Sequence, residues 1–190
     1  MSVDRKQLII NAATKSFSLF GYKATTMDQV AKLANVGKGT IYTFFNNKEE
    51  LLDEIVTSLI KEMKTAAEDT IQPDLSFHEN ANRALYRLLE FRKEHQLTIK
   101  LFQEEKEIGT PAVMEVMQKV EQAIINYIKG KVIEAMEKGE IKNCNPEITA
   151  FIMLKLYISL IFDWEKNHRP LNRQDVASLF EFYLFEGLSQ

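Results

Sequence analysis

The sequence has little of what stabilises or specialises many small proteins. Its 190 residues include one cysteine, three histidines, four prolines and one tryptophan. A single cysteine, Cys144, excludes an internal disulfide and is typical of a reducing compartment. No apolar run reaches the roughly 20 residues that a membrane-spanning helix needs, and the charged N-terminus lacks a signal-peptide core. We therefore expect a cytoplasmic protein that does not associate with membranes.

Candidates for enzymatic chemistry are also scarce. The three histidines lie in separate segments without the spacing of metal ligands, and Cys144 has no sequence neighbour that would mark it as a nucleophile. No glycine-rich phosphate loop is present. The acidic residues Glu104, Glu105 and Glu107 are interpreted as a solvated helix face. The sequence therefore predicts no enzyme, no catalytic residue, no metal site and no cofactor.

Charge is unevenly distributed along the chain. The formal net charge is −3, but residues 1–47 carry six basic and two acidic side chains, whereas residues 48–190 carry 18 basic and 25 acidic ones. A basic segment on an acidic body is expected when one end of a protein approaches a polyanion. Charge alone is equally compatible with an ordinary solvated segment, so the assignment depends on the motifs.

Hydrophobic periodicity near 3.6 residues predicts an all-α fold of about nine helices and no strand. The prolines lie between the helical patterns, never inside one. Gly130 weakens the helix that contains it by about 1 kcal/mol relative to alanine, which leaves open whether this segment is one helix or two. The expected helices span residues 4–20, 26–34, 38–45, 47 to beyond 63, 76–95, 97–107, 110–139, 146–167 and 173–188. Capping signals mark several of their starts: Asp4 with Gln7, Thr26 with Gln29, Asn47, Ser76 with Glu79, Asn145 and Asn172.

Residues 26–48, TMDQVAKLANVGKGTIYTFFNNK, combine two short helices with a turn of three to four residues. This is the pattern of a helix-turn-helix, and the preceding helix at 4–20 supplies the third side of a small core. The expected apolar face runs through both short helices and the turn: Val30, Ala31, Ala34, Val36, Ile41 and Phe45.

The residues left outward on the second short helix have the chemistry for reading DNA bases. The recognition helix of such a unit enters the major groove with its N-terminal residues at the base edges. Lys38 can donate to guanine O6 or N7, and Thr40 and Thr43 can bond a base or contact a thymine methyl group. Gly39 leaves room for a close approach of the backbone.

Four further residues are candidates for contact with the DNA backbone. Tyr42 can bond a phosphate, Phe44 can cover sugar or methyl groups, and Thr26 lies at a helix N-terminus, which favours phosphate. Lys48 is expected to reach the same backbone from the start of the long helix. Each has a structural alternative: Thr26 as a cap only, Tyr42 half in the core, Phe44 packed on the long helix and Lys48 solvated.

The segment FGYKATTMDQVAKLANVGKGTIYTFFNNKEEL resembles the DNA-binding segment of the TetR family of bacterial transcriptional regulators. Asn35 replaces the glycine usual before the turn, and it tolerates the left-handed conformation that the turn needs. The resemblance implies a homodimer, a helical ligand domain and repression relieved by a small molecule. It also implies a set of DNA-contact residues: Thr26, Lys38, Gly39, Thr40, Tyr42, Thr43, Phe44 and Lys48.

The remaining chain is expected to serve pairing and sensing. We predict a DNA-binding domain at residues 1–47 and a ligand-binding and dimerisation domain at 48–190. Residues 148–162 are interpreted as a helix buried on most sides, and the two C-terminal helices are apolar enough to pair two chains. Residues 77–138 could enclose an apolar effector, but its pocket residues are not assigned.

The expected partner is a pseudo-palindromic double-stranded DNA operator. The alternative is an architectural DNA-binding protein that acts through a protein partner without an effector.

Overall fold

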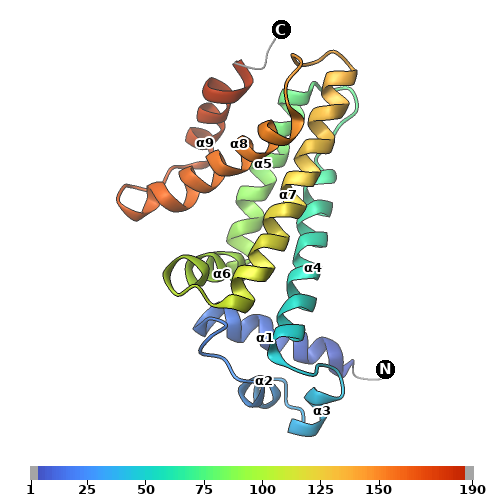
Figure 1. Ribbon diagram of the computed structural model, residues 1–190, viewed down its shortest axis with the longest axis vertical. Helices are drawn as coiled ribbons and strands as arrows, with labels where there is room; N and C mark the ends of the chain where they lie inside the picture. The colour runs from blue at the N-terminus through green and yellow to red at the C-terminus, as the bar shows by residue number, and fades with distance from the viewer. Residues whose placement is uncertain (1–3, 187–190) are drawn as a thin grey trace. The chain divides into compact units, whose positions relative to one another are not determined.

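The described part of the chain is helical throughout (Figure 1). The computed structural model describes residues 4–186, and within this range there is no strand. The predicted all-α class is confirmed. The α-helices are α1 Arg5–Phe20, α2 Met27–Leu33, α3 Lys38–Tyr42, α4 Lys48–Glu68, α5 Phe77–Glu94, α6 Gln96–Glu107, α7 Pro111–Glu137, α8 Pro146–Ile158 and α9 Arg173–Phe180. Shorter turns of other helix types follow α8 at Ser159–Asp163 and Trp164–Lys166, and follow α9 at Glu181–Phe185.

Most of the predicted helix starts are confirmed by their capping contacts. Thr26 and Gln29 form a complete capping box at the start of α2, in which the Thr26 hydroxyl accepts from the Gln29 N–H at 3.2 Å. Asn47 Oδ1 accepts from the backbone of the first turn of α4. Asp4 caps α1 through the Gln7 N–H, but the Gln7 side chain bonds elsewhere, so this capping box is only half formed.

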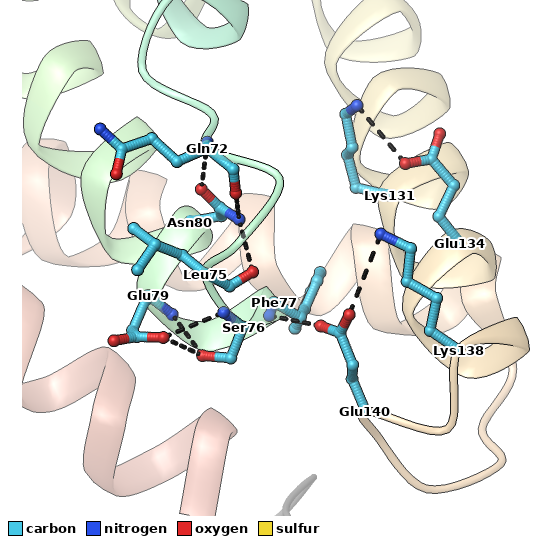
Figure 2. Close-up of polar contacts among 10 residues, drawn as sticks. All are labelled: Gln72, Leu75, Ser76, Phe77, Glu79, Asn80, Lys131, Glu134, Lys138 and Glu140. Carbon is cyan, nitrogen blue, oxygen red and sulfur yellow. Dashed lines mark hydrogen bonds and ion pairs between the residues drawn. The ribbon is translucent and has the colours of Figure 1, made fainter.

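The loop between α4 and α5 is held by its own side chains and by the loop after α7 (Figure 2). Ser76 and Glu79 form the predicted capping box, with the Ser76 N–H donating to Glu79 Oε2 at 2.9 Å. Asn80 bonds the backbone of the same loop. The Phe77 N–H donates to Glu140 Oε2 at 2.6 Å, which fixes the start of α5 against the end of α7.

Two expected helices end differently in the structure, and the alternative left open at Gly130 is decided. The segment around Gly130 is a single helix, because α7 continues unbroken from Pro111 to Glu137. The recognition helix α3 ends at Tyr42 rather than at residue 45. The last helix changes hydrogen-bond pattern after Phe180, and residues 187 and 188 of the expected range lie outside the described part.

The chain divides into two compact units, each with its own core. The first unit combines Met1–Glu62 with Arg92–Val120. It therefore contains α1, α2, α3 and α6 together with the first part of α4 and of α7. Its core joins α1 and the helix-turn-helix to α4, α6 and α7 through buried side chains that include Ile9, Phe17, Val30, Ile41, Leu51, Leu52, Leu101 and Val113.

The second unit combines Met63–Phe91 with Glu121–Gln190. Its main core draws on α5, α7, α8, α9 and the turns that follow them, with buried side chains that include Phe77, Leu85, Val132, Ile141, Ile161, Val176, Phe180 and Phe185. A smaller cluster of Ile125, Ala150 and Leu154 joins α7 to α8. The division of function at residue 47 stays a prediction.

The C-terminal helices expose large apolar side chains. Ile148, Phe151 and Ile152 of α8 are 56%, 46% and 45% exposed, and Phe182 and Tyr183 are also exposed. The expectation of a helix buried on most sides is wrong for the isolated chain. Only one side of this segment packs inside its own unit: Leu154 and Ile161 are buried, and Leu156, Tyr157 and Leu160 are partly buried.

Candidate DNA-binding site

The helix-turn-helix of the first unit has the predicted apolar core. Val30, Ala31 and Ala34 of the α2 segment are buried, as are Ile41 and Phe45. Val36 packs against the same core. Small side chains let α2 and α3 approach closely, so this core fixes the angle at which α3 faces outward.

Asn35 turns the chain between the two helices. Its φ angle is 54°, and among the described non-glycine residues no other positive value occurs. Asparagine is one of the few side chains that accept this left-handed conformation at low cost. The prediction that asparagine can replace the family's glycine here is confirmed, and Val36 then bonds back to Ala31 O at 3.0 Å.

Lys38 stands exposed at the first position of α3. Its Nζ donates to Asp28 Oδ2 of α2 at 3.0 Å, and this hydrogen bond raises the pKa of Lys38. Both side chains are largely exposed, at 67% and 51%, and the pair therefore costs little to separate. Lys38 is charged at neutral pH and can exchange Asp28 for a guanine or a phosphate.

Gly39 faces open space. A Cβ atom built at this position meets no atom within 4 Å, so no contact inside the protein requires a glycine. The preceding Gly37 would place a Cβ only in ordinary contact with Thr40. The absence of a side chain at Gly39 is explained if a partner molecule approaches the backbone there.

The aromatic candidates also lie at the surface. Tyr42 and Phe44 are 45% and 37% exposed, so neither belongs to the core. Tyr42 is half buried, as its structural alternative has it, and Phe44 is about one-third exposed. An exposed phenol at the end of α3 can donate to a phosphate oxygen.

The three threonines use their hydroxyl groups in different ways. The Thr26 hydroxyl accepts from Gln29 and keeps its own proton for an outside acceptor such as phosphate. The Thr43 hydroxyl donates to Thr40 O at 2.7 Å, which leaves its lone pairs for an outside donor. Thr40 is half-buried on α3. Capping and DNA contact are therefore compatible at Thr26.

Lys48 differs from the exposed candidates because it is partly buried. Its Nζ donates to Tyr22 O at 2.9 Å and Thr25 O at 2.8 Å, and stands 4.1 Å from the centre of the Tyr22 ring. Burial lowers the pKa of this ammonium group. Two of its three N–H bonds thus hold the loop between α1 and α2. We interpret Lys48 as a residue that positions the loop before Thr26 and has one donor left for phosphate.

Glu104 of α6 is the residue that sequence reasoning missed. The expected solvated face is wrong for it, because its side chain is only 5% exposed. Its carboxylate accepts from the backbone N–H groups of Tyr22 at 2.7 Å and Lys23 at 2.9 Å, and from the Thr110 hydroxyl at 2.9 Å. A Cβ at Gly21 would come within 2.9 Å of Glu104 Oε2, so glycine is needed where the carboxylate approaches.

The loop between α1 and α2 is therefore held from several helices. Glu104 binds its N–H groups from α6, while Lys48 binds its carbonyl groups from α4. The Tyr22 hydroxyl donates to Glu49 Oε1 at 2.9 Å, and Thr25 donates to Gly21 O. We call this set of contacts the loop clamp. Because the loop leads directly into Thr26 and α2, the loop clamp sets the position of the helix-turn-helix.

Among residues 4–186, no helix combines the length and hydropathy required to cross a bilayer. No three His, Cys, Asp or Glu side chains in that range gather in a way that could hold a metal ion.

Comparison with known proteins agrees with this geometry. The sequence model described as "Bacterial regulatory proteins, tetR family" matches residues 9–55. The HTH-type transcriptional regulator YhgD of Bacillus subtilis (strain 168) is 66% identical over 189 residues, which cover 100% of this chain and 99% of the relative. The chain therefore belongs to the tetR family and is a DNA-binding transcriptional regulator.

Solved structures share the fold over nearly the whole chain. The regulator FadR from Bacillus subtilis, in complex with stearoyl-CoA, has a TM-score of 0.75 at 20% identity and covers 91% of this chain and 92% of its own. AibR, in complex with isovaleryl coenzyme A and operator DNA, has a TM-score of 0.68 at 20% identity and covers 96% and 98%. At this identity the likeness concerns the fold.

Proposed function

We propose that the protein is a homodimeric repressor that leaves its pseudo-palindromic operator when an acyl-CoA thioester binds its helical body. The observation that carries the proposal is the outward face of α3, where Lys38, Gly39 and Thr40 lie on a fixed helix-turn-helix. The fold is shared with FadR and AibR, which were solved with acyl-CoA ligands, and this supports the effector class. The protein would act in the cytoplasm, where bacterial DNA lies.

The exposed apolar residues of α8 and of the last turn support the dimer. Ile148, Phe151 and Ile152 have the i, i+3, i+4 spacing of one helix face, and each exposes more than a third of its surface. Clusters of this kind mark interaction sites in soluble proteins. A two-fold pairing would bury them and would present two copies of α3 about one DNA turn apart, or a multiple of it.

Long helix α4 offers a route from effector to DNA. It begins at the loop clamp, where Lys48 and Glu49 bond Tyr22, and runs without interruption to Glu68 in the second unit. A ligand that favours a different position of α4 would move the helix-turn-helix with it. Regulation then requires that the ligand bind the released conformation more tightly, and a full switch needs about 5 kcal/mol of preference.

The proposed function is tested by selecting bound fragments from the genome that encodes the protein and titrating the complex with stearoyl-CoA and isovaleryl-CoA. We expect one of these thioesters to weaken operator affinity about 5- to 150-fold in fluorescence anisotropy, the usual range of coupling between two sites. Free stearate controls for detergent effects. Unchanged affinity with every thioester would instead favour the architectural alternative, in which a protein partner replaces the effector.

Substitution of Gly39 by alanine separates DNA contact from folding. The new methyl group meets nothing inside the protein, so we expect the melting temperature to stay the same or rise, as alanine favours a helix by up to about 1 kcal/mol. Operator affinity should fall about tenfold or more, because the methyl group would be forced against DNA. Gly130→Ala is the matched control: its Cβ also meets open space, but on α7, and it should leave operator affinity unchanged.

A further inference from the structure

The ion pair between Asp28 and Lys38 places opposite charges side by side on the surface of the helix-turn-helix. Asp28 lies in the first turn of α2, two residues after Thr26, and Lys38 is the first residue of α3. The carboxylate and the ammonium group are 3.0 Å apart, and both side chains are largely exposed. Any base that the ammonium group approaches in this position therefore also meets the carboxylate of Asp28.

Asp28 is unusual because acidic side chains are scarce in this part of the chain. Residues 1–47 contain two acidic residues, Asp4 and Asp28, against six basic ones. A carboxylate near DNA repels the phosphate groups. An acidic side chain in the first turn does favour the positive end of the helix dipole, which accounts for Asp28 on α2. The pairing with Lys38 is a second feature that the helix dipole does not require.

Both groups can form further hydrogen bonds while they stay paired. Among the residues that the structure describes, Lys38 Nζ bonds only Asp28, so two of its three N–H groups remain for an outside acceptor. The carboxylate of Asp28 accepts from Lys38 through one oxygen and has lone pairs left for an outside donor. The pair therefore presents two donors directly beside an acceptor.

The major-groove edge of a G·C base pair has the complementary pattern. Guanine offers the acceptors N7 and O6, and the N4 amino group of cytosine is a donor beside them. O6 and N4 are joined by a base-pairing hydrogen bond and so lie about 2.9 Å apart, close to the 3.0 Å between the two charged groups. The ammonium group can thus face N7 and O6 while the carboxylate faces N4.

Other base pairs match this arrangement less well. In an A·T pair the two acceptors lie on either side of the adenine N6 amino group, so the ammonium group meets one acceptor instead of two. In the reversed pair, C·G, the carboxylate faces the guanine acceptors and the ammonium group faces the cytosine donor. The ion pair therefore distinguishes G·C from the three other base pairs.

We infer that Asp28 and Lys38 bind one G·C base pair of each half-site as a unit, with Lys38 on the guanine and Asp28 on the cytosine. This inference rests on the proposed placement of α3 in the major groove. It makes Asp28 a determinant of sequence specificity, because its charge lowers affinity for DNA that offers no donor to the carboxylate.

The inference is tested by selecting half-sites from a randomised pool with wild type and Asp28→Ala, and by anisotropy titration of the selected operators. For wild type we expect one G·C position per half-site at which A·T weakens binding about 5- to 150-fold. For Asp28→Ala this penalty should shrink about fivefold or more, and affinity for unrelated DNA should rise. N4-methylcytosine at that position, which lacks the major-groove N–H, should weaken binding of wild type but not of Asp28→Ala.

Two further variants separate base reading from a structural role. Lys38→Gln should lose the preference at the same base pair, and the double variant should lose little more than either single one. Glu54→Ala is the matched control, because Glu54 forms a similarly exposed ion pair with Lys6 in the same unit. It changes the net charge equally and should keep every base preference. If Asp28→Ala also kept the wild-type preference at every position, whether or not its overall affinity changed, the inference would be overturned.

The same titrations distinguish this inference from the proposed function. If a thioester releases the protein from its operator but Asp28→Ala leaves the base preferences unchanged, the inference is wrong and the proposed function stands. If Asp28→Ala relaxes the preference at one G·C position but no thioester releases the protein, the inference stands and the proposed effector is wrong.

Discussion

Replacement of Glu104 by alanine is expected to destabilise the first unit by about 3 kcal/mol or more and to abolish tight operator binding. The carboxylate accepts from two backbone N–H groups and a hydroxyl in a nearly dry environment. Alanine would leave these donors without acceptors, and each buried donor left unsatisfied costs about 1–3 kcal/mol. The loss should be largest at Tyr22, whose backbone and side chain are both part of the loop clamp.

The effect on DNA binding follows from the position of the loop. Tyr22 and Lys23 immediately precede the capping box at Thr26, so a loosened loop allows α2 and α3 to move together. The apparent affinity for DNA is the intrinsic affinity multiplied by the fraction of molecules in which α3 is correctly placed. It therefore falls even where the unit stays folded. Glu104→Gln should have a smaller effect, because its amide keeps one acceptor oxygen but sets a donor against a backbone N–H group.

Thermal unfolding followed by circular dichroism and anisotropy titration with the selected operator measure both effects. Glu107→Ala is the matched control, since Glu107 is exposed on the same helix. We expect the control to melt and to bind as wild type does. If Glu104→Ala melted with the wild type and bound the operator equally well, the loop clamp would have no role in positioning the helix-turn-helix.

Replacement of Ile152 by glutamate is expected to convert the dimer to a monomer. The side chain lies on the exposed α8 stripe, and burying a carboxylate in an apolar interface without a partner is prohibitively costly. A monomer engages one half-site at a time, so operator affinity should fall about a hundredfold or more, the advantage that linked binding confers.

Analytical ultracentrifugation measures the change in mass, and anisotropy measures the loss of affinity. Ile133→Glu is the matched control, because Ile133 is also an exposed isoleucine of the second unit but lies on α7. It should remain dimeric and bind DNA. A dimeric Ile152→Glu variant with full affinity would show that α8 does not form the interface.

Local signals in the sequence predicted the helices well. Thr26 with Gln29, Ser76 with Glu79 and Asn172 with Asp175 are capping boxes in the structure. A cap depends on residues three positions apart, so it can be recognised without knowing the fold. The outward face of α3 could also be predicted from local sequence. Once the apolar positions of this short helix are assigned to the core, the remaining positions lie on the side that faces solvent.

Contacts between distant segments could not be predicted in this way. Glu104 is separated from Tyr22 by 82 positions in the chain, and nothing around it distinguishes it from exposed Glu107. Lys48 was expected to face DNA because it begins a helix next to α3, but the carbonyls that it binds belong to another loop. In both cases the partners of a charged side chain are mainly backbone groups, which leave no compensating charge in the sequence. The contact of Lys48 with DNA stays a prediction.

Average hydrophobicity was also a poor guide to burial. Residues 148–162 are apolar on several sides, and we expected the chain to bury most of them. The structure buries one side and leaves Ile148 and Phe151 exposed, which a single sequence cannot distinguish from a core helix. Gly130 likewise costs too little to end α7, because a helix of 27 residues packed along its length absorbs about 1 kcal/mol.

Hydroxyl-radical footprinting of the selected operator tests the central claim most directly. If two protomers present α3 to successive major grooves, the protein should protect two half-sites related by a two-fold axis, with centres one helical turn of about 10 base pairs apart or a multiple of it. The protection should disappear at both half-sites together when the effective thioester is added. A single protected site, or a continuous protection without sequence symmetry, would contradict the account of a dimeric operator-reading regulator.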